Sequence, residues 1–124
     1  MRQAARNGSV GSNIVSTVDS PWRERLLTLH TQVHNMVTKA GCAGAGTKNA
    51  KGDHVKLFDL TANDTALTVL RKFQLPLVVD SEESGRQEIG SGVPRHRLVL
   101  DPVDGSDNWA QGLPLSALSC AVLP

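Results

Sequence analysis

The stretch that decides the fold is Leu98-Val99-Leu100-Asp101-Pro102-Val103-Asp104-Gly105-Ser106-Asp107-Asn108-Trp109. Its three leading apolar residues predict a short buried strand, which delivers Asp101 and, three residues later, Asp104. Gly105 and Ser106 then open a short helix, at whose start backbone N–H groups lack partners within the helix. Carboxylates hold hard divalent cations, and a helix start with free N–H groups holds phosphate. The stretch therefore indicates a metal and a phosphate at one place, which is typical of phosphoryl chemistry.

A second acidic element, Ser81-Glu82-Glu83-Ser84, follows the apolar run 75–79. We expect the two acidic ends to lie at one edge of a sheet, where open α/β folds place their ligands. Asp-Pro and Asp-Gly are also common turn dipeptides. A plain α/β scaffold whose acidic turns are only caps is therefore the alternative that the residues alone leave open.

The composition limits the class of protein. The chain has 124 residues, 13 basic against 12 acidic residues, a net charge of +1 and 3% aromatic residues. These values argue against a nucleic-acid partner, because they offer neither a strong positive field nor a stacking platform. No apolar run reaches the length of a membrane span, so no membrane partner is expected. Cys42 and Cys120 are isolated, which favours reduced structural thiols and a cytoplasmic location.

Two amphipathic stretches predict helices over 21–40 and 60–73. The first begins at the pair Ser20-Pro21, which is typical of a helix start, and the second has Asp59 or Thr61 as its cap. The residues predicted to be buried are Trp22, Leu26, Leu29, Val33 and Met36 in the first helix, and Ala62, Ala66, Val69, Leu70 and Phe73 in the second.

The other segments are predicted to be short strands and irregular connections. Residues 1–20 are polar and lack the hydrophobic region of a secretory signal, so we expect a flexible leader before one domain over 21–124. The expected strands are 77–79, 98–100 and 115–123, with a short helix at 106–111. The expected connections are a small-residue linker over 41–46, a polar loop over 47–53 and a polar excursion over 86–97.

These elements resemble the inositol monophosphatase superfamily of metal-dependent phosphatases. Residues 101–106 are similar to its Asp-Pro-(Ile/Val)-Asp-Gly-(Thr/Ser) signature, residues 81–84 to its Glu-Glu element, and residues 56–66 to the segment with a catalytic Asp. The Ser-Glu-Glu variant most resembles members that act on both inositol phosphate and fructose bisphosphate. The resemblance implies the amino-terminal part of a layered α/β sandwich of the sugar-phosphatase type, with two long helices packed on a mixed sheet.

The resemblance also implies two magnesium sites built from oxygen ligands, and a weaker third ion. Glu82, Asp101 and the backbone carbonyl of Val103 would ligate the first Mg²⁺, and Asp101 would bridge to a second ion held by Asp104. Glu83 is implied to lie around these ligands rather than among them.

The same resemblance implies how phosphate and water are handled. The backbone N–H groups of Gly105 and Ser106 would hold the phosphate. The Ser106 hydroxyl, paired with Asp59, would orient and deprotonate an attacking water whose pKa the ions lower. Glu82 joins this catalytic set through its metal. Lys48 matches a flexible-loop lysine, and Asp53 would assist the third ion.

One family element has no counterpart in this sequence. Family members continue into a second half that supplies a Trp-Asp element, whereas Trp22 and Trp109 are followed here by Arg23 and Ala110. We therefore expect a truncated Mg²⁺-dependent phosphomonoesterase with little or no turnover. Its expected partner is a small inositol or sugar phosphate, and a homodimer is expected of the full-length form. The alternative is a non-catalytic module that binds Mg²⁺ or a phosphorylated ligand.

Overall fold

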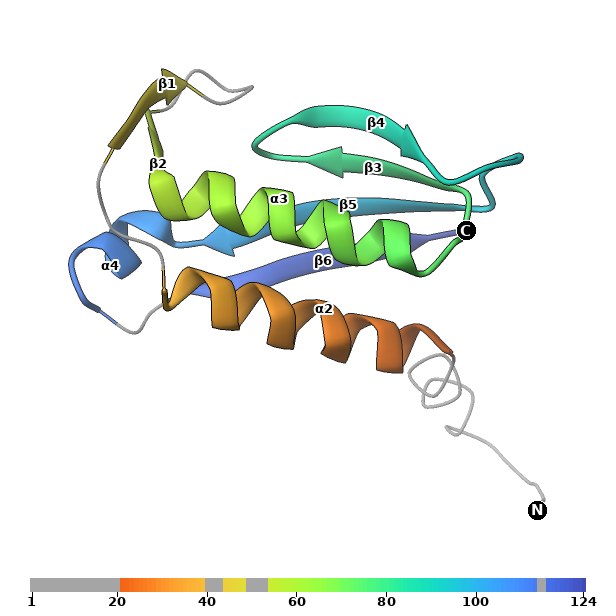
Figure 1. Ribbon diagram of the computed structural model, residues 1–124, viewed down its shortest axis with the longest axis horizontal. Coiled ribbons are helices and arrows are strands. Elements are labelled where there is room, and N and C mark those ends of the chain that lie inside the picture. Colours follow the sequence, from red (N-terminus) through yellow and green to blue (C-terminus); the bar gives the residue numbers. More distant parts are fainter. Residues whose placement is uncertain (1–20, 40–43, 49–53, 114–115) are drawn as a thin grey trace, which may run out of the picture.

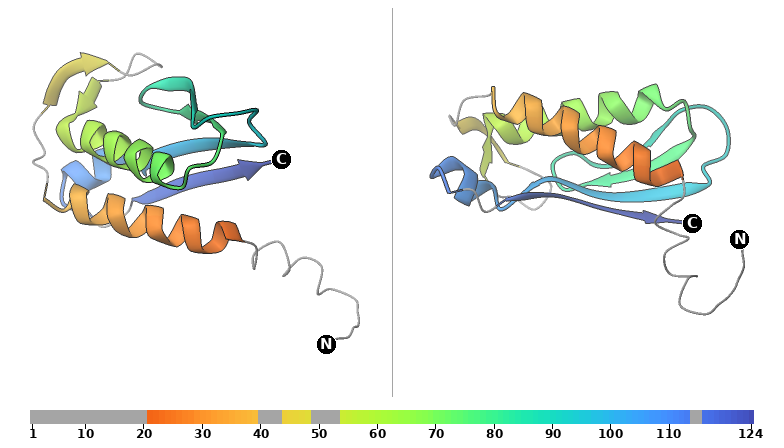
Figure 2. Two further views of the ribbon diagram at one scale, coloured as in Figure 1. Left: turned by 45° about the vertical axis from the view of Figure 1, so that its right-hand side comes forward. Right: turned by 90° about the horizontal axis from the view of Figure 1, so that it is seen from below.

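The computed structural model describes residues 21–39, 44–48, 54–113 and 116–124. The elements in chain order are α2 (Pro21–Val37), β1 (Gly44–Lys48), β2 (His54–Lys56), α3 (Leu57–Lys72), β3 (Leu77–Ser81), β4 (Gly85–Ile89), β5 (His96–Asp104), α4 (Ser106–Ala110) and β6 (Ala117–Leu123). Strands β3 to β6 form a mixed four-stranded sheet in the order β4-β3-β5-β6, and β1 and β2 form a separate antiparallel pair. Helices α2 and α3 lie side by side on one face of the larger sheet (Figure 1, Figure 2). The expected α/β architecture is confirmed.

The core fills the space between the two helices and the sheet. Burying a Leu or Phe side chain contributes about 1.5–3 kcal/mol, so this interface is the main source of stability. In α2, Val37 is 5% exposed and Met36, which was predicted to be buried, is 39% exposed. The reason is that the residue one helical turn after buried Val33 on the same face is Val37, four residues on, and not Met36. The buried apolar residues are Leu29, Val33, Val37, Phe58, Ala62, Ala66, Leu67, Val69, Leu70, Leu77, Val79, Ile89, Leu98 and Leu100.

Strands β3 and β5 are parallel neighbours, with Ser81 beside Leu100. The backbone N–H of Glu82 extends this pairing, because it donates to the Leu100 carbonyl at 2.9 Å. The ends of the two strands therefore meet at the same edge of the sheet, where Glu82 directly follows β3 and Asp101 directly follows Leu100 in β5. The chain between these ends runs back through β4, which is antiparallel to β3.

The sheet face that points away from the helices carries a small ion-pair network. The Nε atom of Arg86 lies 2.9 Å from one Asp80 oxygen, and the Nε atom of Arg97 lies 2.5 Å from the other. The hydrogen bond from Arg86, followed by that from Arg97, lowers the pKa of Asp80. This network holds β3, β4 and β5 together on the solvent side.

Several predicted boundaries were wrong. Helix α3 begins at Leu57, so Asp59 lies in its first turn and does not cap it, although an acid there still favours the helix dipole. Residues 85–89 form strand β4 instead of part of a polar excursion, because backbone hydrogen bonds to β3 do not require apolar side chains. Residues 44–48 form β1 instead of a linker and loop. Among the described helices, none combines the length and apolar character needed to cross a membrane.

Candidate metal and phosphate site

A bulge near the end of β5 brings two carboxylates to one face of the sheet. Asp101 pairs with Ser119 of β6 and Asp104 pairs with Ala117, so a step of three residues on β5 matches a step of two on β6. Such a bulge shifts the alternation of side chains by one residue, and Asp101 and Asp104 thereby share a face. Pro102, which has no N–H to offer a neighbouring strand, is fully buried inside the bulge.

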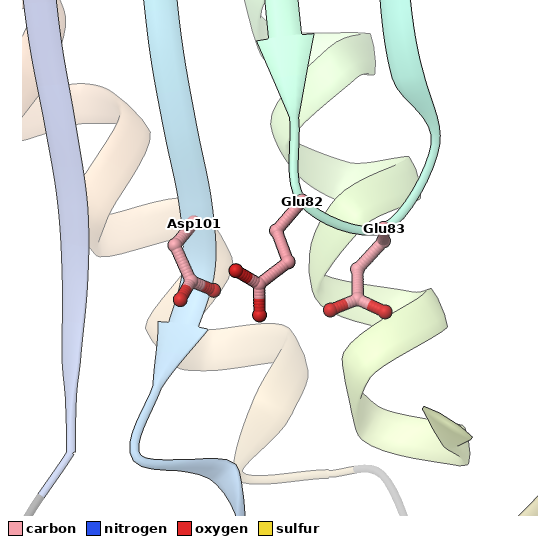
Figure 3. A group of neighbouring side chains, drawn as sticks. All are labelled: Glu82, Glu83 and Asp101. Atoms are coloured by element: carbon pink, nitrogen blue, oxygen red, sulfur yellow. The ribbon is translucent and has the colours of Figure 1, made fainter. Parts of the chain in front are cut away.

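Three carboxylates gather at this edge of the sheet. Figure 3 shows Glu82 and Glu83, from the turn after β3, next to Asp101 of β5. One carboxylate oxygen from each residue lies within 4.8 Å of the other two. Oxygen ligands at about 2.1–2.5 Å from one hard cation lie at most about 5 Å from one another. The spacing of the three carboxylates therefore suits a shared divalent cation.

The electrostatics of Asp101 point the same way. The pKa of Asp101 is raised from 3.8 to about 6; burial is the largest cause, followed by the negative charges of Glu82 and Asp104. A hydrogen bond from the Val103 backbone N–H opposes the rise, and the charge of Asp59 adds to it. Asp59 itself is 4% exposed, at the start of α3. Several acids thus repel one another at one place, and positive charge there would offset the repulsion.

A buried oxygen of Asp101, Oδ1, makes no hydrogen bond to the described residues. A buried polar atom without a partner costs about 1–3 kcal/mol. Hard oxygen donors without thiolate or imidazole suit Mg²⁺ better than softer metals. The residues present therefore fit a hard divalent cation.

The phosphate side of the predicted site follows directly after Asp104. Gly105 adopts a left-handed conformation, with φ of +84°, and begins the short helix α4. A glycine adopts this conformation without the steric cost of a side chain, so the chain can turn sharply from β5 into α4. Gly105 and Ser106 are half-buried at this turn. The pairing of Ser106 with Asp59 and the role of the Val103 carbonyl stay predictions.

The structure distributes the remaining predicted residues differently from the expected ligand set. Glu83, expected around the ligands, lies within the three-carboxylate group. Within the described part of the chain, Asp104 is not a member of that group, and it acts on Asp101 through its charge. Lys48 is the last residue of β1, and Asp53 lies outside the described residues.

Sequence reasoning missed two buried polar residues behind the acids. Asn63 of α3 is 4% exposed, and Ser81 at the end of β3 is 5% exposed. Asp59 and Asn63 are four residues apart, so they share one face of α3. A polar pair at this spacing on an otherwise apolar helix face is the signal that could have identified Asn63.

The hollows on the described part of the molecule differ in how close they lie to the acids. One, of about 440 Å³, adjoins the acids and is lined by β3, β5 and β6. The larger one, of about 690 Å³, lies between α2 and β6 near the opposite end of β5, and none of the described residues that line it is acidic. We place the candidate site at the hollow of about 440 Å³, because Glu82 and Asp101, with its buried oxygen, line it.

Comparison with known proteins finds curated relatives whose names include a phosphatase activity. No family model matches the chain. The chain is 34% identical over 107 residues to a fructose-1,6-bisphosphatase/inositol-1-monophosphatase of Methanothermobacter thermautotrophicus, and the match covers 82% of this chain and 38% of the relative. It is 37% identical over 89 residues to fructose-1,6-bisphosphatase 1 of Bos taurus, which covers 67% of this chain and 26% of that protein.

The solved structures agree in fold. The extragenic suppressor protein suhB of Bartonella henselae matches 83% of this chain with a TM-score of 0.68 and 23% identity, and the chain covers 40% of it. The chain spans 38% of the length of the first curated relative and 26% of the length of the second. Both of those relatives are named as phosphatases. Over most of its length the chain is similar in sequence to members of the inositol monophosphatase and fructose-1,6-bisphosphatase superfamily.

Proposed function

We propose that this chain supplies the metal- and phosphate-binding part of a Mg²⁺-dependent phosphomonoesterase that acts on inositol monophosphate, fructose bisphosphate or both. The observation that carries the proposal is the group of Glu82, Glu83 and Asp101, whose oxygens lie within 4.8 Å of one another. The buried Asp101 oxygen, which lacks a partner among the described residues, supports the same reading. The name of the Methanothermobacter thermautotrophicus relative, a fructose-1,6-bisphosphatase/inositol-1-monophosphatase, supports both substrates.

The acids are needed because a phosphate monoester carries two negative charges that repel an attacking hydroxide. Two or three Mg²⁺ ions, when bound, would lower the pKa of a water and offset the charge of the transferring phosphoryl group. Glu82, Asp101 and Asp104 would hold them, together with the Val103 carbonyl, and Glu83 lies close enough to contribute an oxygen.

The protein's own groups would orient the substrate and the water. The backbone N–H groups of Gly105 and Ser106 hold the phosphate oxygens at the turn into α4. The Ser106 hydroxyl binds the attacking water and passes its proton toward Asp59, the buried carboxylate at the start of α3. Lys48 and Asp53 belong to a loop that would screen substrate charge and assist a third ion.

A second candidate function concerns the chain by itself. Because it spans 38% or less of the curated relatives' length, we propose that residues 21–124 are the amino-terminal part of a phosphatase domain. On this proposal the 124-residue chain binds Mg²⁺ and phosphorylated ligands with little or no turnover. A cytoplasmic location and a homodimer of the longer form belong to the same proposal.

The test combines metal binding with phosphate release. Mg²⁺ is titrated into the chain by calorimetry, and phosphate release is measured with inositol 1-phosphate and with fructose 1,6-bisphosphate. Mg²⁺ binding with phosphate release supports the enzyme, and Mg²⁺ binding without release supports the non-catalytic module. The absence of both binding and release supports the plain scaffold. Asp101→Asn is expected to abolish Mg²⁺ binding, whereas Asp64→Asn, on the exposed face of α3, is the matched control. Equal Mg²⁺ affinity in Asp101→Asn and wild type would contradict the metal assignment.

A further inference from the structure

A buried polar relay joins helix α3 to the turn that carries Glu82 and Glu83. The hydroxyl of Ser81 donates to Oδ1 of Asn63 at 2.5 Å. The backbone N–H of Glu83 in turn donates to Oγ of Ser81 at 3.2 Å. Asn63 and Ser81 are both more than nine-tenths buried, so water does not compete for these bonds.

Each bond of the relay has a fixed direction. A serine hydroxyl has one proton and two lone pairs. The proton of Ser81 is directed to Asn63, which leaves its lone pairs to accept from Glu83. The side chain of Asn63 thereby determines how the Ser81 hydroxyl is oriented, and that hydroxyl fixes the backbone at Glu83.

A second attachment fixes the same turn from the neighbouring strand. The Glu82 N–H donates to the carbonyl of Leu100, the residue directly before Asp101. Glu82 is therefore tied to β5, and Glu83 is tied through Ser81 to α3. Both glutamate side chains start from backbone atoms that are held in place relative to Asp101.

We infer that Asn63 is a positioning residue for the candidate metal site and acts through Ser81 on the turn that presents Glu82 and Glu83. The inference rests on the proposed function, because it assigns Asn63 a part in holding carboxylates for a cation. Groups that orient metal ligands typically change metal affinity 10–100-fold when they are removed. The role differs from core packing, because it depends on a hydrogen-bond acceptor at residue 63 and not on side-chain volume.

The test measures the Kd for Mg²⁺ of the full chain by calorimetry. Asn63→Leu keeps the approximate volume and removes the acceptor, and Ser81→Ala removes the hydroxyl; each is expected to raise the Kd about 10-fold or more. The Kd of the double variant for Mg²⁺ is expected to be no higher than that of the single variant with the higher Kd, because the two residues act in one relay. Ser81→Thr keeps the hydroxyl and is expected to restore affinity to within about threefold of wild type.

A matched control separates positioning from general loss of stability. Val69→Ala, on the same helix and 6% exposed, is expected to lower the urea midpoint and leave the Kd unchanged. Hydrogen exchange at the Glu83 amide, followed by NMR, is expected to accelerate in Asn63→Leu and in Ser81→Ala but not in Val69→Ala. If Asn63→Leu does not fold, the comparison of Ser81→Ala with Ser81→Thr decides.

The outcomes distinguish the two proposals. A wild-type chain that binds no Mg²⁺ overturns the proposed function and the positioning role with it. A wild-type chain that binds Mg²⁺ while Asn63→Leu and Ser81→Ala bind it equally well overturns only the positioning role. Additive losses in the double variant likewise refute the relay.

Discussion

Replacing Asp101 by asparagine is expected to stabilise the metal-free protein at neutral pH while it removes metal affinity. Asp101 has a pKa of about 6 in the folded chain, against an ordinary value of 3.8. Between these values the folded state binds more protons than the unfolded state, so stability falls as pH rises from about 4 to about 6 and stays lower above. At 1.36 kcal/mol per pH unit, the full effect is about 3 kcal/mol. Asp101 is only half-buried, and solvent screening reduces the effect to about 1.5 kcal/mol.

The assay is urea denaturation in EDTA, followed by tryptophan fluorescence at pH 4 and pH 7.5. At pH 4 the wild type and Asp101→Asn are expected to have similar midpoints, because the wild-type carboxyl is protonated. At pH 7.5 the variant midpoint is expected to be higher by about 1 M, for a slope of about 1.5 kcal/mol/M. Adding Mg²⁺ is expected to stabilise the wild type, through binding to the folded state, and to leave the variant unchanged.

Asp64→Asn is the control for this experiment, because Asp64 is exposed on α3 and outside the acidic group. Its midpoints are expected to follow the wild type at both pH values. An Asp101→Asn protein that is no more stable than wild type at pH 7.5 in EDTA would refute the reasoning that burial and neighbouring charges penalise the ionised form.

Four further substitutions test other parts of the structure. Asp80→Asn is expected to lower the urea midpoint at pH 7. The difference from wild type should begin to shrink as pH falls below 3.8 and close once pH passes the lowered pKa of folded Asp80, where the carboxylate that binds the two arginines becomes protonated. Gly90→Ala places a Cβ 2.3 Å from the Leu75 carbonyl oxygen at a φ of +79°, and a loss of about 3 kcal/mol is expected by the same measurement. Gly92→Ala, at φ +98° with its nearest neighbour 4.0 Å away, is expected to lose only about 1–2 kcal/mol. Ala121→Lys puts a charge on the uncharged edge strand β6 and is expected to reduce self-association in sedimentation velocity.

The two acidic ends of the site were predictable because each comes at the end of an apolar run or within three residues after it. The runs before Glu82 and Asp101 indicated buried strands, and β3 and β5 are in fact parallel neighbours. The position of Glu83 was not predictable, since it depends on the turn that Ser81 and Asn63 hold. Long-range hydrogen bonds of this kind leave no periodic pattern in the sequence.

The helical layer was predictable for the same reason as the strands, since its apolar residues recur at helical spacing. Strand β4 was not predicted, because an edge strand pairs through its backbone while exposing polar side chains. The bulge at Pro102 was not predicted, because it depends on how β5 pairs with β6. The residues of β5 alone do not determine that pairing.

The direct pairing of β3 with β5 has a consequence for the segment that connects them. The spacing of Glu82 and Asp101 depends on hydrogen bonds between the strands, and not on the length of the connection through β4. Residues 91–93 at the far end of this connection are exposed, beyond the tightly packed Gly90. Extra residues such as an epitope tag can be inserted there while the acids keep their separation.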